Sequence, residues 1–424
     1  MKGFSSSFFI VLLASSMLVA DMPAAASSYT LEIFGNANLD GTIDPSDIAY
    51  IQSIIEGKAE STELADANND GKVNSQDLDQ VGDIIQGVES ELTMLMDTRT
   101  SMGSTEITKV PVTIKMPVKS IVVTSPYSLS LLRSLKLETE RVAGIPLISK
   151  EAKDYFPEYC EKTAIGSGNE VDYERILSLQ PDLVIVFTSS LDSASEKLPG
   201  VTIATFDFWR PSTYVDETRK LGYILGKRNE SEEFISFYSG IIDTIKERID
   251  EIPEEDKQRV YFESEEPYAT CGNGSGWHEK ATMAGGYNIF GDLQGYPTVD
   301  PEKVMDENPE VIVKQPTSGP VSSAAYLLGT NETALIASRD EIMNRSELSQ
   351  VDAVKNGDVY ILYGDVIGAT RHFVGIAYMA KWFYPDTFDD LDPYAIHREY
   401  LTKFQGLPED FLDKNGMFAY SEPI

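Results

Sequence analysis

Two segments near the start of the chain place oxygen-bearing side chains at intervals that suit a calcium ion. They begin at Asn36 and Asp66 and read NANLDGTIDPSD and DANNDGKVNSQD. Each has a glycine, Gly41 or Gly71, at its sixth position, where the chain must turn sharply around the ion. Calcium takes carboxylate, amide and carbonyl oxygens as ligands. Because two such loops occur in register, the sequence predicts two calcium sites rather than an acidic surface turn.

The predicted ligands occupy positions 1, 3, 5, 7, 9 and 12 of each loop, and position 7 contributes its backbone carbonyl. Each loop runs into an amphipathic segment, IAYIQSII or LDQVGDII, which predicts EF-hand-like loop–helix units. The ligands are Asn36, Asn38, Asp40, Thr42, Asp44 and Asp47 in the first loop, and Asp66, Asn68, Asp70, Lys72, Asn74 and Asp77 in the second.

The pair of loops resembles a type I dockerin over Phe34 to Gly87. The resemblance rests on aspartate at position 12 and on loop–helix units without a preceding helix. It implies a small all-α module that folds with calcium and inserts into a cohesin module of a scaffold or cell-surface protein. In that family positions 10 and 11 help to select the cohesin, and here they are Pro45-Ser46 and Ser75-Gln76. Pro45 departs from the small hydroxyl residue that is usual there.

A long amphipathic stretch, Asn229 to Ile252, organises the rest of the chain. Its apolar residues recur at steps of three and four, which predicts one helix about 35 Å long. Two similar segments flank it and align without a gap: VDYERILSLQPDLVIVF from Val171 and VDPEKVMDENPEVIVK from Val299. Each predicts a short helix, a turn and a buried strand. We therefore expect two doubly wound α/β lobes joined by one long helix, with an ordinary crossover helix as the alternative.

The predicted domain limits follow from these segments. Residues 88–104 are interpreted as a linker, although ELTMLM could pack locally. The two-lobed domain then covers 105–424, with lobe 1 over about 105–228 and lobe 2 over about 253–424 on either side of the helix. Alternation over Ile107–Ile114 predicts a hairpin, and a helix that starts near Asp392 is expected to be the last one.

Thr105 to Ile424 resembles the solute-binding components of ABC importers for ferric siderophores, haem and cobalamin. The motifs are VPVTIKMPVKSIVVTSP, the two aligned segments, GGYNIFGDL from Gly285 and the tail from Arg371. The resemblance implies a substrate-binding protein, not an enzyme, that closes little on a metal complex and passes it to a permease. One alternative is a dockerin-bearing carbohydrate-active enzyme with paired carboxylates in a sugar cleft. Another is a structural surface protein whose lobes bind nothing.

Aromatic and basic residues follow several predicted strands, and in doubly wound sheets ligands lie at the carboxyl ends of strands. Aromatic faces suit a catecholate, corrin or porphyrin, and arginine pairs with an anionic chelate. The histidines could ligate iron or cobalt directly. Alternatively, the aromatic residues belong to the lobe cores and the histidines cap helices. The candidates are Tyr127, Trp209, Arg210, Trp277, His278, Arg371 and His372.

Glu174 and Glu302 occupy equivalent positions in the two aligned segments. The family resemblance implies that one glutamate on each lobe meets arginines of the membrane permease. The alternative is a surface acid that the helix dipole favours at the start of a helix. Equivalent positions in two lobes favour docking.

Composition and the chain start narrow the possible partners and location. A formal net charge of −33 argues against nucleic acid and anionic membranes, since both need basic patches. Residues 1–26 are interpreted as a signal peptide with an apolar run that ends at Ala20, and no later segment is long enough to span a membrane. We expect a secreted protein, extracellular or associated with the cell surface. The two cysteines, Cys160 and Cys271, exclude a disulfide framework, and a bond between them would tie the lobes together.

Overall fold

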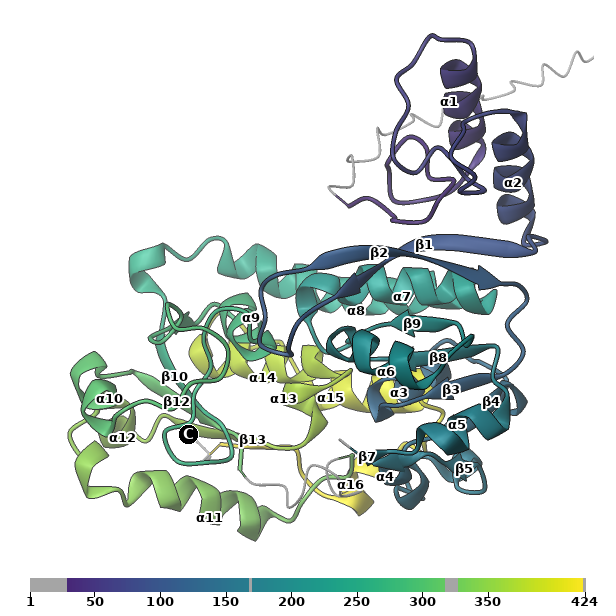
Figure 1. Cartoon of the computed structure of the whole chain (residues 1–424). Helices are drawn as coiled ribbons and strands as arrows, with labels where there is room; N and C mark the ends of the chain where they lie inside the picture. Colours follow the sequence, from purple (N-terminus) through teal and green to yellow (C-terminus); the bar gives the residue numbers. More distant parts are fainter. Residues whose placement is uncertain (1–28, 168–169, 317–326, 422–424) are drawn as a thin grey trace, which may run out of the picture.

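The computed structural model describes residues 29–167, 170–316 and 327–421. They form a small loop–helix module (residues 29–88) and two α/β lobes (Figure 1). The signal-peptide interpretation of residues 1–26 lies outside the described residues. Among the described residues, no helix combines the length and apolar character that a bilayer crossing needs.

Lobe 1 is built on a five-stranded parallel sheet in the order β5-β4-β3-β8-β9. Counted along the chain this order is 3-2-1-4-5, so the direction of winding reverses between β3 and β8. The strands are β3 (Ile121–Val123), β4 (Val142–Ile145), β5 (Thr163–Ala164), β8 (Leu183–Val186) and β9 (Ile203–Thr205). The main helices are α3 (Pro126–Ser134), α5 (Tyr173–Leu179), α6 (Leu191–Lys197) and α7 (Pro211–Leu225).

Lobe 2 has a second five-stranded sheet in the order β11-β10-β12-β13-β14, in which only β14 is antiparallel to its neighbour. The order is 2-1-3-4-5 along the chain, which puts the reversal between β10 and β12. The strands are β10 (Arg259–Glu263), β11 (Tyr287–Asn288), β12 (Val311–Lys314), β13 (Val359–Leu362) and β14 (Ala419–Tyr420). The helices include α9 (Gly276–Met283), α10 (Pro301–Glu307), α11 (Glu332–Met343) and α12 (Asp352–Asn356). The prediction of two doubly wound lobes is confirmed.

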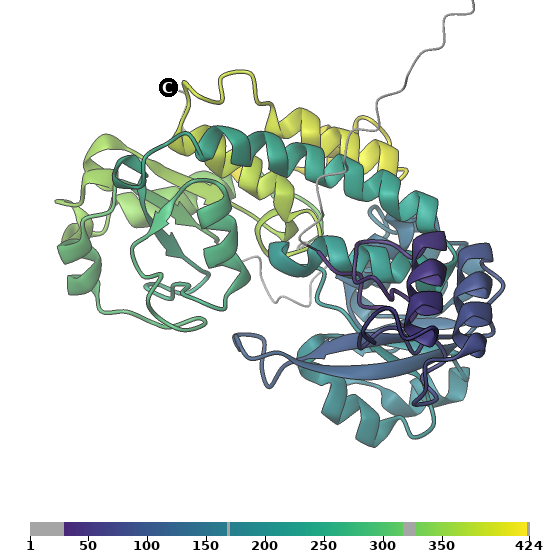
Figure 2. The same ribbon diagram turned by 90° about the horizontal axis from the view of Figure 1, so that it is seen from above.

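The long helix α8 (Arg228–Ile249) runs from lobe 1 to lobe 2, as predicted (Figure 2). Its apolar stripe is buried against α14 (His372–Phe383), which belongs to the same core. The helix near Asp392, α15 (Pro393–Glu399), is not the last one, because α16 (Phe411–Asn415) and β14 follow it.

The two aligned segments fold alike. Helices α5 and α10 both begin at an aspartate whose side chain caps the helix, Asp172 or Asp300. Both end at a residue in the left-handed conformation, Gln180 (φ 48°) or Asn308 (φ 42°), and each leads into a buried strand, β8 or β12. The predicted repeat is therefore confirmed in detail.

The segment 88–104 is not a linker. Strand β1 (Glu91–Thr98) forms an antiparallel hairpin with β2 (Thr108–Lys115), so the hairpin expected within 107–114 has its second strand here. Five consecutive residues of β1, Leu92–Met96, are buried. A strand covered on both faces lacks the alternation that reveals a half-exposed strand, which explains the error.

The loop–helix module packs firmly on lobe 1. Its helices are α1 (Pro45–Ile55) and α2 (Ser75–Gln86), and its first residues run along β1, where Ile33 forms a bridge with Met94. The Lys220 amine on α7 is buried and lies 2.9 Å from carboxylate oxygens of both Glu32 and Asp216. Burial alone would lower the pKa of Lys220, but these two acids raise it. Apolar residues of the module and lobe 1 form one continuous core, which extends through α8 and α14 into lobe 2.

Candidate calcium and ligand-binding sites

The two predicted calcium loops share one internal hydrogen-bond pattern. In each loop the side-chain oxygen at position 3 accepts the backbone N–H of position 5, and the carboxylate at position 5 accepts the N–H of position 7. Position 4 is left-handed in both, at Leu39 and Asn69. The N–O distances are 3.0 and 2.9 Å for Asn38–Asp40 and Asp40–Thr42, and 3.0 and 3.0 Å for Asn68–Asp70 and Asp70–Lys72. This curvature turns side-chain oxygens toward the inside of each loop.

The aspartates at position 12, Asp47 and Asp77, are buried in the first turns of α1 and α2, where each accepts the backbone N–H of the N-cap residue, Asp44 or Asn74. Asp47 accepts the backbone N–H groups of Asn38 and Asp44 at 3.1 and 2.9 Å. Burial raises the pKa of Asp47 to about 6 and raises that of Asp77 as well. A buried carboxylate without a cationic partner is the arrangement that a bound cation would stabilise.

The first loop position differs between the two loops. The Asn36 amide donates to the carbonyls of Leu31 and Asp40, at 2.7 and 2.6 Å, and its Oδ1 is buried without a hydrogen-bond partner. Asp66 instead accepts the N–H groups of Asp70 and Gly71. An unpartnered buried oxygen fits a calcium ligand. In the described ranges no three His, Cys, Asp or Glu side chains converge on one point, so calcium would depend on amide and carbonyl oxygens as well.

On lobe 1, an aromatic pair lies beyond the carboxyl ends of β3 and β8. The ring centroids of Tyr127 and Phe187 are 5.8 Å apart, and both side chains are half-buried. Ser125 fixes the start of α3 because its hydroxyl accepts the Tyr127 N–H at 3.1 Å. This is the reversal point of the sheet, where a ligand is expected. Tyr127 was predicted, whereas Phe187 was missed although it follows β8 directly.

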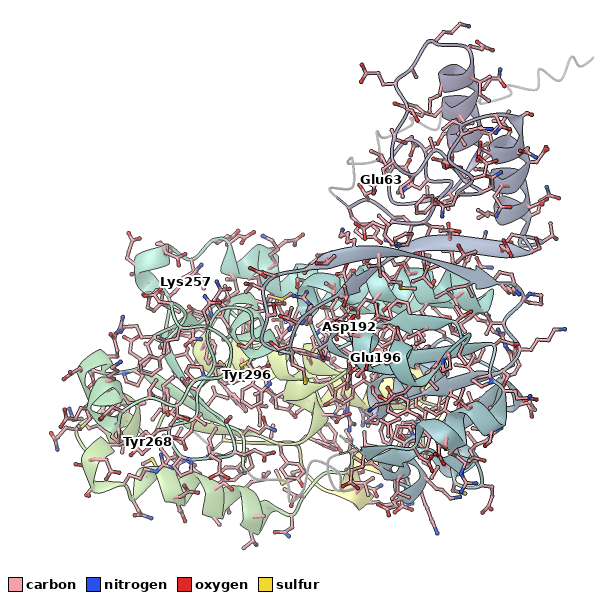
Figure 3. The ribbon with its side chains drawn as sticks, viewed as in Figure 1. Glu63, Asp192, Glu196, Lys257, Tyr268 and Tyr296 are labelled. Atoms are coloured by element: carbon pink, nitrogen blue, oxygen red, sulfur yellow. The ribbon has the colours of Figure 1, made fainter. Side chains whose placement is uncertain are left out.

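On lobe 2, Tyr296 lies on the side that faces lobe 1 (Figure 3) and belongs to a second aromatic pair. The rings of Trp277 and Tyr296 meet edge to face at 6.2 Å, and Tyr296 is 46% exposed. Trp277 itself is buried and packs on Phe262 at the end of β10, so it is a core residue, and Tyr296 is the exposed ring of the pair. Tyr296 was missed because it follows no predicted strand.

His278 is half-buried, and its Nδ1 lies 3.2 Å from the Asn288 amide nitrogen. Burial lowers the pKa of His278, so the ring is neutral near pH 7. The amide nitrogen is a donor, which assigns Nδ1 as the acceptor and puts the proton on Nε2. In this tautomer the ring has no free lone pair for direct metal ligation.

Arg371 and His372 are fully buried, which corrects the expectation that they contact a ligand. The Arg371 guanidinium forms an ion pair with Asp365 and donates to the Leu327 carbonyl at 2.6 Å. His372 lies 3.2 Å from the Tyr238 hydroxyl on α8. Both residues follow a strand, but their side chains turn into the core. They stabilise the junction of α13 (Asp365–Gly368), α14 and α8.

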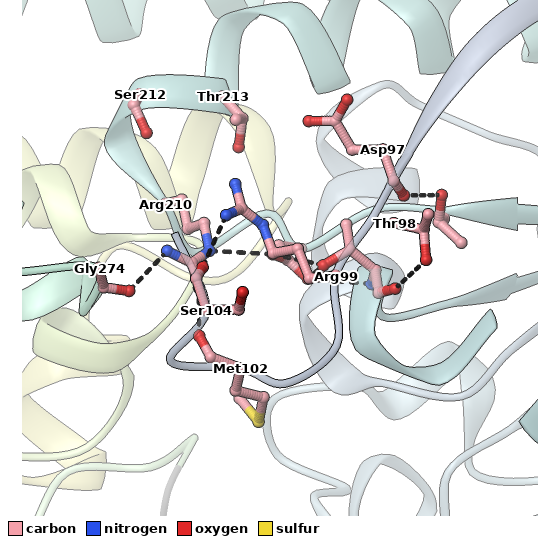
Figure 4. A network of polar contacts seen from close by, with 12 residues as sticks. Asp97, Thr98, Arg99, Met102, Ser104, Arg210, Ser212, Thr213 and Gly274 are labelled. Carbon is pink, nitrogen blue, oxygen red and sulfur yellow. Dashed lines mark hydrogen bonds and ion pairs between the residues drawn. The ribbon is translucent and has the colours of Figure 1, made fainter. Parts of the chain in front are cut away.

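Trp209 and Arg210 are also buried, at a contact between the lobes. The Arg210 guanidinium donates to Asp207 at 3.1 Å, to the Gly274 carbonyl of lobe 2 at 2.9 Å and to the Met102 carbonyl (Figure 4). With its donors used in this way, Arg210 connects protein segments and does not present a free charge to a ligand.

Glu174 and Glu302 are exposed in the first turns of α5 and α10, as the repeat predicts. Cys160 and Cys271 are both free thiols, so no disulfide joins the lobes. Burial raises the pKa of the Cys271 thiol to about 12.

Comparison with known proteins decides the family. Residues 121–366, more than half of the chain, match the periplasmic binding protein family. The chain belongs to that family. Periplasmic binding proteins are non-enzymatic components of ABC importers, so the carbohydrate-active enzyme considered above is set aside. Residues 35–85 match the dockerin type I domain, and the loop–helix module is therefore a dockerin domain.

Individual relatives of this periplasmic binding protein agree with the family assignment. It is 24% identical over 289 residues to an uncharacterized ABC transporter substrate-binding lipoprotein of Bacillus subtilis, covering 66% of this chain and 84% of the relative. It is 24% identical over 212 residues to the vitamin B12-binding protein of Yersinia pseudotuberculosis, covering 48% and 74%. The TroA-like periplasmic binding protein FepB of Veillonella parvula has the same fold, with a TM-score of 0.61, 22% identity and coverage of 77% and 99%.

Proposed function

We propose that this protein binds a metal complex, such as a ferric siderophore, haem or a corrinoid, outside the cytoplasm and passes it to an ABC permease. The observation that carries the proposal is the pair of aromatic clusters, Tyr127–Phe187 on lobe 1 and Trp277–Tyr296 on lobe 2. Aromatic faces stack on a corrin, porphyrin or catecholate rim. The similarity to a vitamin B12-binding protein supports this ligand class.

The same geometry indicates how the metal would be held. His372 is buried, and His278 has its Nδ1 hydrogen-bonded. Arg210 and Arg371 are occupied by protein acceptors. The binding protein would therefore recognise the organic part of the complex, and the chelator itself would supply the metal ligands.

The dockerin domain would bind calcium through the two loops and hold the protein at a cohesin-bearing scaffold or cell-surface protein. Two observations support this role: the buried, unpartnered Asn36 Oδ1 and the buried Asp47 carboxylate suit a cation. The residues at positions 10 and 11, Pro45-Ser46 and Ser75-Gln76, are exposed and available to a partner. One calcium ion in each loop would supply the positive charge around which that loop closes.

Delivery would use Glu174 and Glu302. They lie at equivalent places on two lobes that α8 connects, and both are exposed. Two acids at a fixed spacing would fix the orientation of the protein on a permease that carries matching arginines.

The ligand can be identified by native mass spectrometry and absorbance of protein purified without unfolding. We expect one bound metal complex per chain, or saturable binding of one of three probes: a ferric catecholate, haemin or cyanocobalamin. A bound oligosaccharide, or no binding of any probe, would contradict the proposed ligand class.

A further inference from the structure

The tip of the β1–β2 hairpin (residues 99–107) reaches from lobe 1 to lobe 2. Figures 1 and 2 show the hairpin lying along lobe 1 with its tip directed at the other lobe. In the view from above, α8 runs along one side of the molecule and the hairpin along the other. The hairpin tip therefore approaches lobe 2 on the side of the molecule away from α8.

Backbone atoms of the hairpin tip and lobe 2 approach closely at glycines. A Cβ built at Gly103 would lie 3.4 Å from the Gly295 Cα. A Cβ at Gly274, where φ is +79°, would lie 2.6 Å from the Thr105 Cγ2 and 2.9 Å from the Gly103 oxygen. A methyl group at Gly103 would only touch Gly295, so a larger, branched side chain is needed there to push the tip away, whereas any side chain at Gly274 would collide with the tip.

Hydrogen bonds from Arg210 stabilise this contact between the hairpin tip and lobe 2. Its guanidinium joins three segments: Asp207 after β9, Met102 in the hairpin tip and Gly274 in lobe 2. Arg210 is only 1% exposed, so these charge-assisted hydrogen bonds are shielded from water. Breaking them would leave a buried guanidinium without acceptors.

A second arginine anchors the base of the tip to lobe 1. The Arg99 side chain donates to the Ser104 carbonyl at 2.9 Å, and its backbone N–H donates to the Thr188 carbonyl at 3.2 Å. Trp209 adds an apolar contact, because a Cβ at Gly276 of lobe 2 would lie 2.6 Å from its ring. The tip is thus fixed to both lobes.

We propose that the hairpin tip is a clasp that holds the two lobes at one separation and so limits the size of the ligand that fits between them. The connecting helix limits motion on its own side of the molecule, and an attachment on the opposite side resists the small rotations of the lobes that remain. The clasp rests on the contacts described here and does not depend on the identity of the ligand.

The clasp can be tested by measuring the distance between spin labels on the two lobes with pulsed electron paramagnetic resonance. Labels at the exposed positions Ser178 on α5 and Lys303 on α10 suit this purpose. The background is Cys160→Ser, since Cys271 is buried. We expect one narrow distribution of label-to-label distances for the otherwise unmodified chain. For Arg210→Ala we expect a broader distribution with a longer mean distance.

Gly103→Val provides a second variant that leaves the buried arginine in place and keeps the test valid if Arg210→Ala fails to fold. It should also lengthen and broaden the distribution. Ser101→Val, an exposed position on the same tip, serves as the control and should leave it unchanged. If the folded Gly103→Val protein keeps the narrow distribution of the unmodified chain, the clasp is overturned.

Discussion

The two lobes reverse their winding at corresponding points but fill those points with different chemistry. In lobe 1 the point between β3 and β8 is covered by the half-buried rings of Tyr127 and Phe187. In lobe 2 the point between β10 and β12 holds a buried ion triad, in which Glu263 lies 3.0 Å from Lys314 and 2.7 Å from Arg345. The Arg345 guanidinium lies over the ring of Tyr268, 4.9 Å from its centroid. Figure 3 labels Tyr268 in lobe 2.

The sheet topology creates a reversal point in each lobe, and the side chains at that point determine whether it can bind a ligand. The lobe 2 triad has one acid for two cations, and Glu341 supplies a second acid at Arg345. The triad also holds the following loop, because Lys314 donates to the Ser264 carbonyl at 2.7 Å. Lobe 2 instead exposes the ring of Tyr296, which meets the buried Trp277 of α9 edge to face. We infer that the reversal point serves ligand binding in lobe 1 and stability in lobe 2.

The largest effect should come from removing the shared anion of the lobe 2 triad. Glu263→Ala leaves two cations near each other in the interior, which should cost about 3–5 kcal/mol of unfolding free energy. Urea denaturation measures this loss. Glu266→Ala, an exposed acid three residues away, is the control and should change stability by less than about 0.5 kcal/mol. A loss below about 1 kcal/mol for Glu263→Ala would show that the triad is not structural.

Removing the aromatic residues should weaken ligand binding and leave the fold intact. Tyr127→Ala and Tyr296→Ala should each reduce affinity by about 1.5–3 kcal/mol through lost apolar contact. Calorimetry with the probe that binds the unmodified protein measures the change. Tyr287→Ala removes a ring that is 46% exposed on the edge strand β11 and should bind normally. Unchanged affinity in both site variants would place the ligand elsewhere.

Calcium removal should act on lobe 1 more than on lobe 2, because the dockerin domain contacts lobe 1 directly, through the Ile33–Met94 bridge to β1 and the Glu32–Lys220 ion pair to α7. Hydrogen exchange in EGTA should show loss of protection throughout the dockerin domain. Exchange should be about tenfold faster in β1 and α7, which corresponds to about 1.4 kcal/mol, with little change in β12 and β13. Equal protection of β1 and α7 with and without calcium would contradict this coupling.

The smallest expected effect is a difference in pH response between the lobes. Burial next to Asp207 raises the pKa of Glu217 in lobe 1 above its ordinary value. The folded state therefore binds the Glu217 proton more tightly than the unfolded state does. The stabilisation from this protonation is present at low pH. It is lost as pH rises from the pKa of Glu217 in the unfolded chain through its pKa in the folded chain. Glu217→Gln should remove that loss and flatten the decline of the urea midpoint between about pH 5 and pH 8.

The pKa of Glu263 in lobe 2 shifts in the opposite direction, so its effect on stability has the opposite pH dependence. Burial alone would raise the pKa of Glu263, but Arg345 and Lys314 lower it below its ordinary value. Its contribution is therefore present above the unfolded pKa and is lost as pH falls through the folded value. A urea midpoint whose pH dependence is the same in Glu217→Gln and the unmodified protein would refute the assignment for lobe 1.

The sequence revealed the features that depend on local pattern. The aligned segments before β8 and β12 and the stripe of α8 have clear periods, and the calcium loops have fixed spacing. Strand β1 was missed because burial on both faces removes its alternation. Arg371 was misassigned because a position after a strand does not show which way a side chain points. Its partner Asp365 becomes evident only in the folded chain.

The lobes differ at their reversal points but agree at Glu174 and Glu302, and the proposed delivery to a permease depends on that agreement. The direct test is the affinity of the protein for its permease reconstituted in nanodiscs, which needs no knowledge of the ligand. Each single alanine variant should bind about tenfold more weakly, a loss of about 1.4 kcal/mol, and the double variant should not bind measurably.

Matched controls are exposed acids in the first turns of other helices of the same lobes, Asp192 on α6 and Glu332 on α11. Their alanine variants should bind the permease like the unmodified protein. Wild-type affinity of the Glu174→Ala/Glu302→Ala double variant would contradict docking through the two lobes.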